Sequence, residues 1–426
     1  MNFPPPDYVQ TTSAVPGITV FMPRPQAEDQ HEVVSFACPQ CDATTAYSAE
    51  NGGLTCTFCG FYEPPAQATV GRAAQEFEFT VETVERAAHG WGVERKELTC
   101  QRCGAHTTVS TDMLTHTCPF CGSNQVVQAK ATQDVLRPRF LAPVTTTVDS
   151  CRQNTAVWLG SSWLLPDNLR QLARIAEFTP VFLPFWTFDA QATADWRAEV
   201  AHTRTKSAWH NGRRVTRTVV EWRWESGHVN QTFDDVLVNG STRISPVLLS
   251  QLRSFDLNAL TPYDPSFLAG IPAQAYDTGL EAAWEMGRHK MRQRTKTACQ
   301  SQATSQRIRN FSMNLDFSAE SWRYVLLPVY LSTYRYNGRS FQVMVHGQNG
   351  TVVGQRPVDW WKVALAGTGA ILPGIALGLF ALYLSSQASS LSDYQGMAAL
   401  AAIVALVMAL VFIAYTVRTA LRMDDI

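Results

Sequence analysis

Two hydrophobic patterns divide the chain. Between about residue 180 and residue 345, apolar and polar residues alternate in short runs, as in half-buried β-strands. These runs include Glu199–Thr203, Val215–Trp224, Phe233–Val238 and Ser340–Val345. Val363–Leu384 and Met397–Val417 are instead unbroken apolar stretches of 22 and 21 residues without a charge. We therefore predict an antiparallel sheet in the middle of the chain and two membrane-crossing helices near its end.

Turn and helix signals refine this prediction. Asn211-Gly212 and Asn337-Gly338 are typical of tight hairpin turns. A helical pattern covers about Thr278–Arg309, and shorter helices are predicted near Pro166–Phe178 and Pro246–Phe255. Two similar segments, Leu183-Pro184-Phe185-Trp186 and Leu327-Pro328-Val329-Tyr330, each open a strand that precedes an Asn-Gly turn. They raise the hypothesis of a duplicated sheet unit, against the alternative of two ordinary strands that contain proline.

Eight of the ten cysteines form two copies of one pattern, C-x2-C-x14-C-x2-C, displaced by 62 positions. Two tight turns that each supply two thiolates are typical of a zinc ribbon. Redox pairs or disulfides would not explain a long interval repeated in register. We predict one structural Zn²⁺ in each ribbon, with four-cysteine ligand sets Cys38, Cys41, Cys56, Cys59 and Cys100, Cys103, Cys118, Cys121. Cys151 and Cys299 have no partner motif and are expected to be ordinary packed or surface thiols, not ligands.

The knuckle turns also contain glycine. Gly60, Gly104 and Gly122 each follow the second cysteine of a pair, where left-handed backbone is expected.

The patterns taken together predict that the whole chain is α+β and multidomain. Its expected parts are a disordered segment (1–30), the first ribbon (31–65), a strand and helix linker (66–97), the second ribbon (98–130), one or two α+β domains (131–358) and a transmembrane hairpin (359–422).

The charged flanks of the apolar stretches predict their orientation. Arg356 and Lys362 precede the first stretch, and Arg418 and Arg422 follow the second, whereas the connecting residues 385–396 contain no Lys or Arg. Positive flanks remain in the cytoplasm. We therefore expect a multi-pass protein of the inner (cytoplasmic) membrane with both termini in the cytoplasm, where thiols stay reduced.

Small residues recur within the two apolar stretches. Gly374 and Gly378 form a GxxxG pattern in the first, and Ala401, Ala405 and Ala409 recur every four residues in the second. Such spacing lets helix backbones approach closely. A tight hairpin of the two helices is expected, and a homo-oligomer contact through the same faces is the alternative.

Charge argues against nucleic acid as a partner. Residues 1–130 contain seven Lys and Arg against 14 Asp and Glu, whereas phosphate binding needs excess cations. A basic cluster does occur at Arg288, Lys290, Arg292, Arg294 and Lys296. Its spacing distributes the cations around a helix, so a solvated helix face is the simpler interpretation and a lipid or RNA site the alternative.

Catalytic signatures are absent from the sequence. It contains no HExxH, no GxSxG and no GxxxxGK[ST] phosphate loop. A zinc with four cysteine ligands also leaves no position for an activated water. We therefore expect no enzyme. The crowded tryptophans, Trp222 and Trp224 among them, are expected to pack beneath a helix or to line a peptide groove.

Three segments resemble a known family. CPFCGS at Cys118–Ser123, FLPFWTFDA at Phe182–Ala190 and the run LLPVYLSTYRYNGRSFQVMVHGQNGTVVGQRP at Leu326–Pro357 are similar to bacterial membrane-anchored double zinc-ribbon proteins. These are often labelled TFIIB-type zinc-ribbon or primosomal-helicase-like. The chain departs from them at His346–Gly350, where an Asn-Gly-x-Thr-Gly turn is expected.

The resemblance implies a role in recruitment. Some of these proteins are associated with phage-shock-type membrane-stress proteins and with band-7-like scaffolds. The expected function is a non-catalytic membrane scaffold or adaptor that recruits cytosolic proteins in an envelope-stress response. The alternative is a membrane-tethered nucleic-acid-binding protein of replication or transcription.

Overall fold

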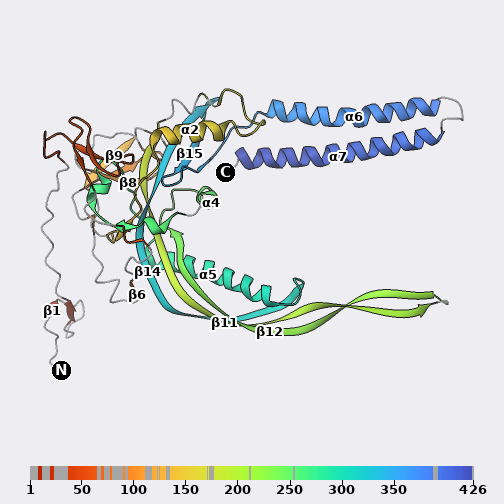
Figure 1. The fold of residues 1–426 in the computed structure, drawn as a ribbon, viewed down its shortest axis with the longest axis horizontal. Coiled ribbons are helices and arrows are strands. Elements are labelled where there is room, and N and C mark those ends of the chain that lie inside the picture. Colours follow the sequence, from red (N-terminus) through yellow and green to blue (C-terminus); the bar gives the residue numbers. More distant parts are fainter. Residues whose placement is uncertain are drawn as a thin grey trace.

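Three long strands, β11 (Thr179–His210), β12 (Arg213–Asn239) and β14 (Ile308–Tyr336), run through the middle of the molecule (Figure 1). They confirm the antiparallel sheet that the alternating pattern predicts. The structure is a computed structural model. It describes residues 8–11, 20–23, 37–64, 69–71, 77–78, 90–91, 95–110, 118–121, 123, 125–130, 135–169, 171, 177–210, 213–252, 255–386 and 392–424.

β11 lies at the centre of the sheet, between β12 on one side and β14 on the other. The opposite edge of β14 pairs in turn with three elements. They are β6 (Phe77–Glu78), β10 (Phe140–Leu141) and β15 (Arg339–His346). β13 (Thr261–Pro262) pairs with β10, and β16 (Val352–Gly354) pairs with β15. Among the strand pairs of the described residues, β10 and β14 alone run parallel, so the sheet is mixed but mainly antiparallel.

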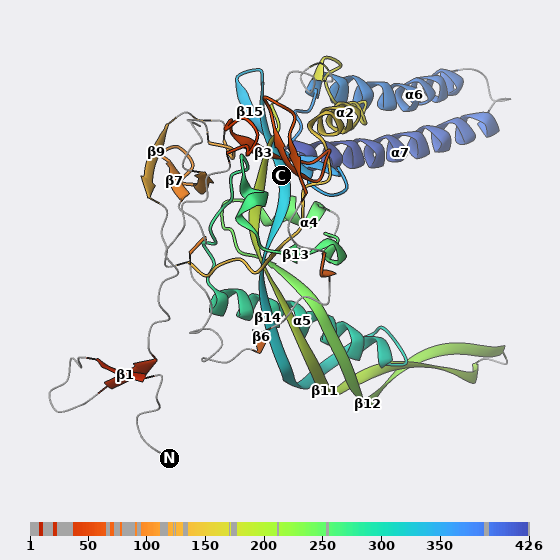
Figure 2. The same cartoon turned by 60° about the vertical axis from the view of Figure 1, so that its left-hand side comes forward.

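The hairpin of β11 and β12 extends beyond the rest of the sheet (Figures 1 and 2). Its strands stay paired from Phe185–Asn239 to His210–Arg213. The predicted turn at residues 211–212 lies outside the described residues. Residues 203–207 and 216–218 are exposed on both strand faces, so this part packs against no other described element. We call residues 203–218 the distal arm. The second predicted turn is confirmed, with φ of +47° at Asn337 and +78° at Gly338.

One face of the sheet is covered by helix α5 (Leu280–Gln302). The ring of Trp284 lies edge-on to Phe188, with centroids 5.1 Å apart. A Cβ at Gly287 would lie 2.8 Å from the Phe188 ring, so glycine permits this close approach. The helix is shorter than predicted because the polar residues after Gln302 lead into β14. Cys151 and Cys299, expected to be packed or surface thiols, are both buried.

The opposite face of the sheet forms a second core. Val181, Leu183 and Phe185 of β11 point to this side, where α4 (Pro246–Gln251) and the second cysteine ribbon pack. Their neighbours Phe182, Trp186 and Phe188 belong to the core on the other side. The central strand is therefore buried on both faces, which explains its continuous apolar run.

The two similar Leu-Pro segments pair with each other. Leu183 lies opposite Leu327, and Pro184 opposite Leu326, in the β11–β14 ladder. Both segments thus occupy the centre of the sheet. This pairing does not show a duplication, which stays a hypothesis.

Each cysteine repeat forms a small three-stranded sheet. The first contains β3 (Thr45–Ser48), β4 (Gly53–Cys56) and β5 (Tyr62–Glu63). The second contains β7 (Arg95–Cys100), β8 (His106–Ser110) and β9 (Val126–Lys130). The strand predicted between them is β6, and it joins the large sheet instead of the ribbons. Most of the predicted linker helix lies outside the described residues.

Several short elements complete the chain. A hairpin of β1 (Tyr8–Thr11) and β2 (Val20–Pro23) lies within the segment for which disorder is expected. Helix α2 (Val148–Leu159) and the 3-10 turns η2 (Leu257–Ala259) and η3 (Pro265–Leu268) surround the sheet. Part of the helix predicted near Pro166–Phe178 lies outside the described residues.

Two C-terminal helices project together from one end of the molecule (Figure 1). They are α6 (Trp360–Ser386) and α7 (Ser392–Asp424), and by length and composition both can cross a membrane. A Cβ at Gly374 would lie 2.8 Å from the Leu406 side chain, whereas one at Gly378 would meet nothing within 4 Å. Ala409 is buried, but Ala401 is exposed. The predicted hairpin contact therefore uses only part of each small-residue face.

Candidate metal centres

The same backbone turn recurs at all four cysteine pairs. The N–H of the first cysteine donates to the carbonyl five residues later, which closes a tight knuckle. The four bonds are Cys38 to Ala43, Cys56 to Phe61, Cys100 to Ala105 and Cys118 to Ser123, at 2.7, 2.8, 3.0 and 2.8 Å. Because the backbone fixes the knuckle, both sulfurs of each pair face the same point. This repetition is what the repeated sequence spacing predicts.

Left-handed backbone follows the second cysteine of the described knuckles. Gly60 and Gly104 have φ of +76° and +68°, as predicted, and Gly122 lies outside the described residues. Asp42 occupies the equivalent position after Cys41 with φ of +59°. Sequence reasoning missed this residue because only glycines were sought, although Asp tolerates the left-handed region better than most residues.

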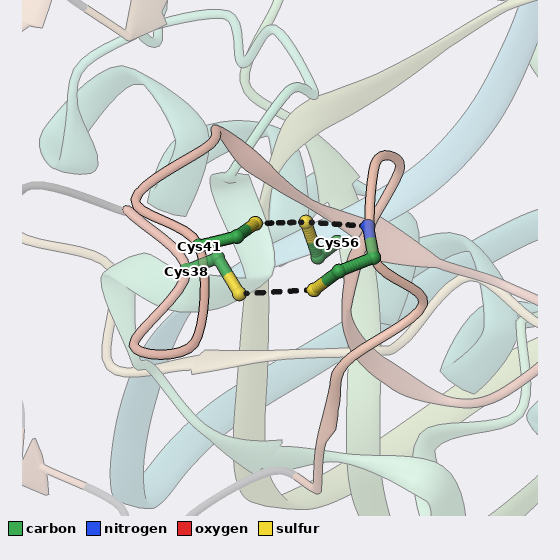
Figure 3. Close-up of side chains that lie close together, drawn as sticks. Cys38, Cys41 and Cys56 are labelled. Atoms are coloured by element: carbon green, nitrogen blue, oxygen red, sulfur yellow. Dashed lines mark hydrogen bonds between the residues drawn. The ribbon is translucent and has the colours of Figure 1, made fainter.

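The four sulfurs of each ribbon lie within 4.8 Å of one another. Figure 3 shows Cys38, Cys41 and Cys56 of the first ribbon facing one another. Cys38 and Cys59 Sγ are 3.5 Å apart, as are Cys41 and Cys56 Sγ. In the second ribbon, the Cys100–Cys121 and Cys103–Cys118 Sγ distances are 3.6 and 3.7 Å. A tetrahedral ion with Zn–S bonds of about 2.3 Å requires sulfurs about 3.8 Å apart. Each tetrad can therefore hold one metal ion of this size and geometry.

Backbone N–H groups donate to two sulfurs of the first ribbon. The N–H of Gln40 donates to Cys38 Sγ at 3.4 Å, and the N–H of Cys59 donates to Cys56 Sγ at 3.5 Å. The Cys59 N–H lowers the pKa of Cys56 to about 6. In the second ribbon, burial raises the pKa of Cys118. A bound cation would compensate this desolvation, because a coordinating thiol is deprotonated.

The second ribbon is built into the large sheet. Thr108 of β8 and Ala273 exchange both backbone hydrogen bonds, at 2.6 and 2.9 Å. Ala273 in turn bridges to Phe182 of β11. The fully buried guanidinium of Arg95 donates to the carbonyls of Thr108 and Ile271 at 3.0 and 3.3 Å. The contacts of Thr108 with Ala273 and of Arg95 with Ile271 join residues more than 160 positions apart, so no local sequence pattern could predict them.

The first ribbon contacts the same segment more lightly. The N–H of Tyr47 donates to the Ala269 carbonyl at 3.1 Å, and its ring lies 5.4 Å from that of Phe267. A Cβ at Gly270 would lie 3.2 Å from Ala46. Residues 267–273 therefore position both ribbons against the sheet.

Equivalent phenylalanines in the two ribbons have opposite environments. Phe58 and Phe120 both precede the last cysteine of their repeat. Phe120 is 7% exposed and packs into the second core, and its carbonyl accepts a 2.8 Å hydrogen bond from Gln342. Phe58 is 83% exposed. One copy of the knuckle is thus docked within the protein, whereas the other presents its ring to solvent.

A third side-chain cluster, made of aspartates, lies within the sheet at β-bulges. Asp189, Asp234 and Asp235 could in principle hold a cation. However, the fully buried Arg323 guanidinium lies among them: its Nη2 donates to Asp235 and lies 3.7 Å from Asp189 Oδ2. Its Nε donates to Thr187 at 3.2 Å. The carboxylates of Asp189 and Asp235 therefore belong to a buried ion cluster, where removal of one partner is costly, whereas Asp234 is exposed.

The predicted basic cluster lies around α5. Arg288 pairs with Glu285 at 3.3 Å, and Lys290 donates to the Leu237 carbonyl at 2.8 Å. Both cations therefore make contacts within the protein, and a lipid or RNA site at this cluster stays an alternative prediction.

The rings of Trp222 and Trp224 contact arginines. The guanidiniums of Arg309 and Arg197 lie over these rings, each 4.2 Å from the centroid, where packing beneath a helix was expected.

The structure explains the unusual turn at His346–Gly350. The Nδ1 atom of the buried His346 accepts hydrogen bonds from the backbone N–H groups of Gln348 and Asn349, at 3.1 and 3.4 Å. Its ring packs on Phe255, with centroids 4.1 Å apart. The histidine therefore fixes the turn and connects it to the second core.

The chain is similar to one curated bacterial protein. The chain is 25% identical over 351 residues to the "Uncharacterized protein YdjG" of Bacillus subtilis (strain 168), which covers 82% of this chain and 96% of that protein. No protein-family model matches the chain, and no solved structure matches it. The similarity therefore covers most of this chain and nearly all of that protein, but it brings no activity with it.

Proposed function

We propose that the protein is a non-catalytic adaptor of the inner membrane that holds two structural Zn²⁺ ions. α6 and α7 anchor it as a hairpin, with both termini in the cytoplasm. The uncharged apolar stretches within these helices and the Lys and Arg at their outer flanks support this orientation. The two tetrads support zinc, because a four-thiolate tetrahedral set suits this ion and a small ribbon has little apolar core of its own.

The exposed ring of Phe58 carries the adaptor proposal. Its counterpart Phe120 shows that this knuckle can dock against a protein surface, where the ring is buried and the adjacent carbonyl is bonded. Phe58 has the same place in an equivalent knuckle but contacts solvent. Tyr62 nearby is also exposed. Exposed aromatic side chains on a rigid scaffold are typical anchors of protein–protein interfaces.

Charge around Phe58 favours a protein partner over nucleic acid. Residues 37–64 contain the acids Asp42, Glu50 and Glu63 and no Lys or Arg. A polyanion would be repelled by this surface, since phosphate contacts rely on cations. A partner with an apolar pocket rimmed by basic residues would complement it. The family resemblance implies phage-shock-type or band-7-like membrane-stress proteins as the partner class.

The test is affinity capture from detergent-solubilised, nuclease-treated membranes. Phe58→Ser should lose the protein partners that the wild type retains. Val127→Ser is the matched control, because Val127 is 52% exposed on the second ribbon, and it should capture normally. Both variants should keep their metal and their membrane fraction. Unchanged capture by Phe58→Ser would refute the docking role. If the wild type captured partners only from membranes without nuclease treatment, the result would favour the nucleic-acid alternative.

A further inference from the structure

The loop after α2 is clamped to the base of the helical hairpin. The N–H of Asp359 donates to the Leu164 carbonyl at 2.8 Å. Lys362 Nζ donates to the Leu165 carbonyl at 2.9 Å and pairs with Asp167 at 2.7 Å. α2 and the start of α6 lie close together in both views (Figures 1 and 2). These contacts hold the loop at one level relative to α6.

An apolar contact fixes that level further. The buried side chain of Leu164 packs with Val363 of α6 and Ala420 of α7. Arg356 Nη1 reaches back to the Trp158 carbonyl at 3.2 Å and to Ser161 Oγ at 2.9 Å. The loop therefore meets both helices where each begins or ends its apolar stretch.

Trp163 stands next to Leu164 and is 55% exposed. Because its neighbour contacts Val363, Trp163 lies at the level of the first turn of α6, where Trp360 and Trp361 are also exposed. Three tryptophans from two distant segments thus share one level. Tryptophan is enriched where acyl chains meet headgroups, because its ring is apolar and its N–H is polar.

We propose that residues 161–165 form a third membrane contact, in which Trp163 inserts into the headgroup–acyl boundary of the cytoplasmic leaflet. The occupant of this surface is phospholipid. The contact is continuous with the proposed anchor of α6 and α7, on which this inference rests. Because the loop is clamped to both helices, inserting Trp163 would hold the ribbons and sheet at a defined distance from the bilayer.

The test places a photoreactive benzoylphenylalanine in the full chain, reconstituted into nanodiscs of phosphatidylcholine and phosphatidylglycerol. The probe replaces Trp163 in one variant. Two reference variants carry it at Leu372, in the middle of α6, and at Val127, on the second ribbon; these side chains are 62% and 52% exposed. Metal content and thermal unfolding establish that each variant is folded.

We expect lipid adducts at positions 163 and 372, with at least about tenfold more at 163 than at 127. Background adducts at 163 beside strong adducts at 372 would overturn this inference and leave the anchor intact. Background at both positions would overturn the anchor as well. Adducts from position 163 to a second protein copy would also overturn the proposed contact of residues 161–165 with lipid.

A second measurement needs no probe. Brominated lipids should quench wild-type tryptophan fluorescence more than that of Trp163→Phe, because the inserted indole lies within reach of bromine. Equal fractional quenching of the two proteins would contradict insertion.

Discussion

Truncating the two knuckle phenylalanines should have unequal effects on stability. Phe120 is buried in the second core, and Phe→Ala at such a site costs about 3–5 kcal/mol. The hollow that Phe120 shares with Leu331 and Met344 lets the site relax, which favours the lower end, about 3 kcal/mol. Phe58 is largely exposed, so Phe58→Ala should change stability by no more than about 0.5 kcal/mol.

These costs convert to measurable shifts in melting temperature. For a domain of 150–250 residues, each kcal/mol corresponds to roughly 2–4 °C. Phe120→Ala should therefore lower the Tm by about 6–12 °C, and Phe58→Ala by no more than about 2 °C. The assay is thermal unfolding of the detergent-solubilised full chain, followed by tryptophan fluorescence. Both variants should retain their metal, because neither residue is a ligand.

A comparable shift from both variants would refute the reasoning. It would mean that the first ribbon buries Phe58 against the protein, or that the second ribbon does not belong to the core. The pair is a matched comparison, because the two residues occupy the same place in a repeated motif.

Two further predictions concern the hairpins. Gly374→Val should weaken the α6–α7 contact, because the added Cβ would lie 2.8 Å from the Leu406 side chain, whereas Gly378→Val should be tolerated. The efficiency of cross-linking between the two helices compares the variants. An equal loss of cross-linking in both would contradict this packing. The distal arm extends in the same direction as α6 and α7 in both figures, towards the side where the bilayer would lie, and it carries the exposed cations Lys206 and Arg217. Placing a cation in hydrocarbon costs about 2.5–3.5 kcal/mol. We therefore expect the arm to lie on anionic headgroups instead of entering the bilayer. Hydrogen exchange of the arm should then slow in anionic but not in zwitterionic nanodiscs, and identical exchange in both would contradict this.

Local patterns predicted the cysteine tetrads well because their geometry is local. A knuckle is closed by backbone bonds within five residues, so spacing alone specifies it. The two apolar helices are likewise evident from composition. The Asn337-Gly338 turn follows from the conformational freedom of its residues.

Sheet extent was harder to predict. The alternating runs found parts of β11 and β12, but Val181–Phe188 is buried on both faces and does not alternate. The helix predicted to Arg309 ends at Gln302, because the pairing of Ile308 with Val200 claims the following residues for β14. Tertiary pairing here overrides a local helical pattern.

The packing of the second ribbon against the large sheet could not be predicted from the sequence. Phe58 and Phe120 share the local pattern T-C-x-F-C-G, but Phe120 is buried beside Gln342 and Phe58 is exposed. The buried Arg323 and the clamp at Leu164 likewise join residues far apart in the chain. Such features depend on the assembled fold, since sequence spacing carries no information about them.

Elemental analysis of the purified full chain tests the central claim most directly. The account predicts two zinc ions per chain, and one after Cys38→Ser with Cys41→Ser, or after Cys100→Ser with Cys103→Ser. Fewer than one zinc in the wild type, or a content that neither double variant lowers, would contradict it.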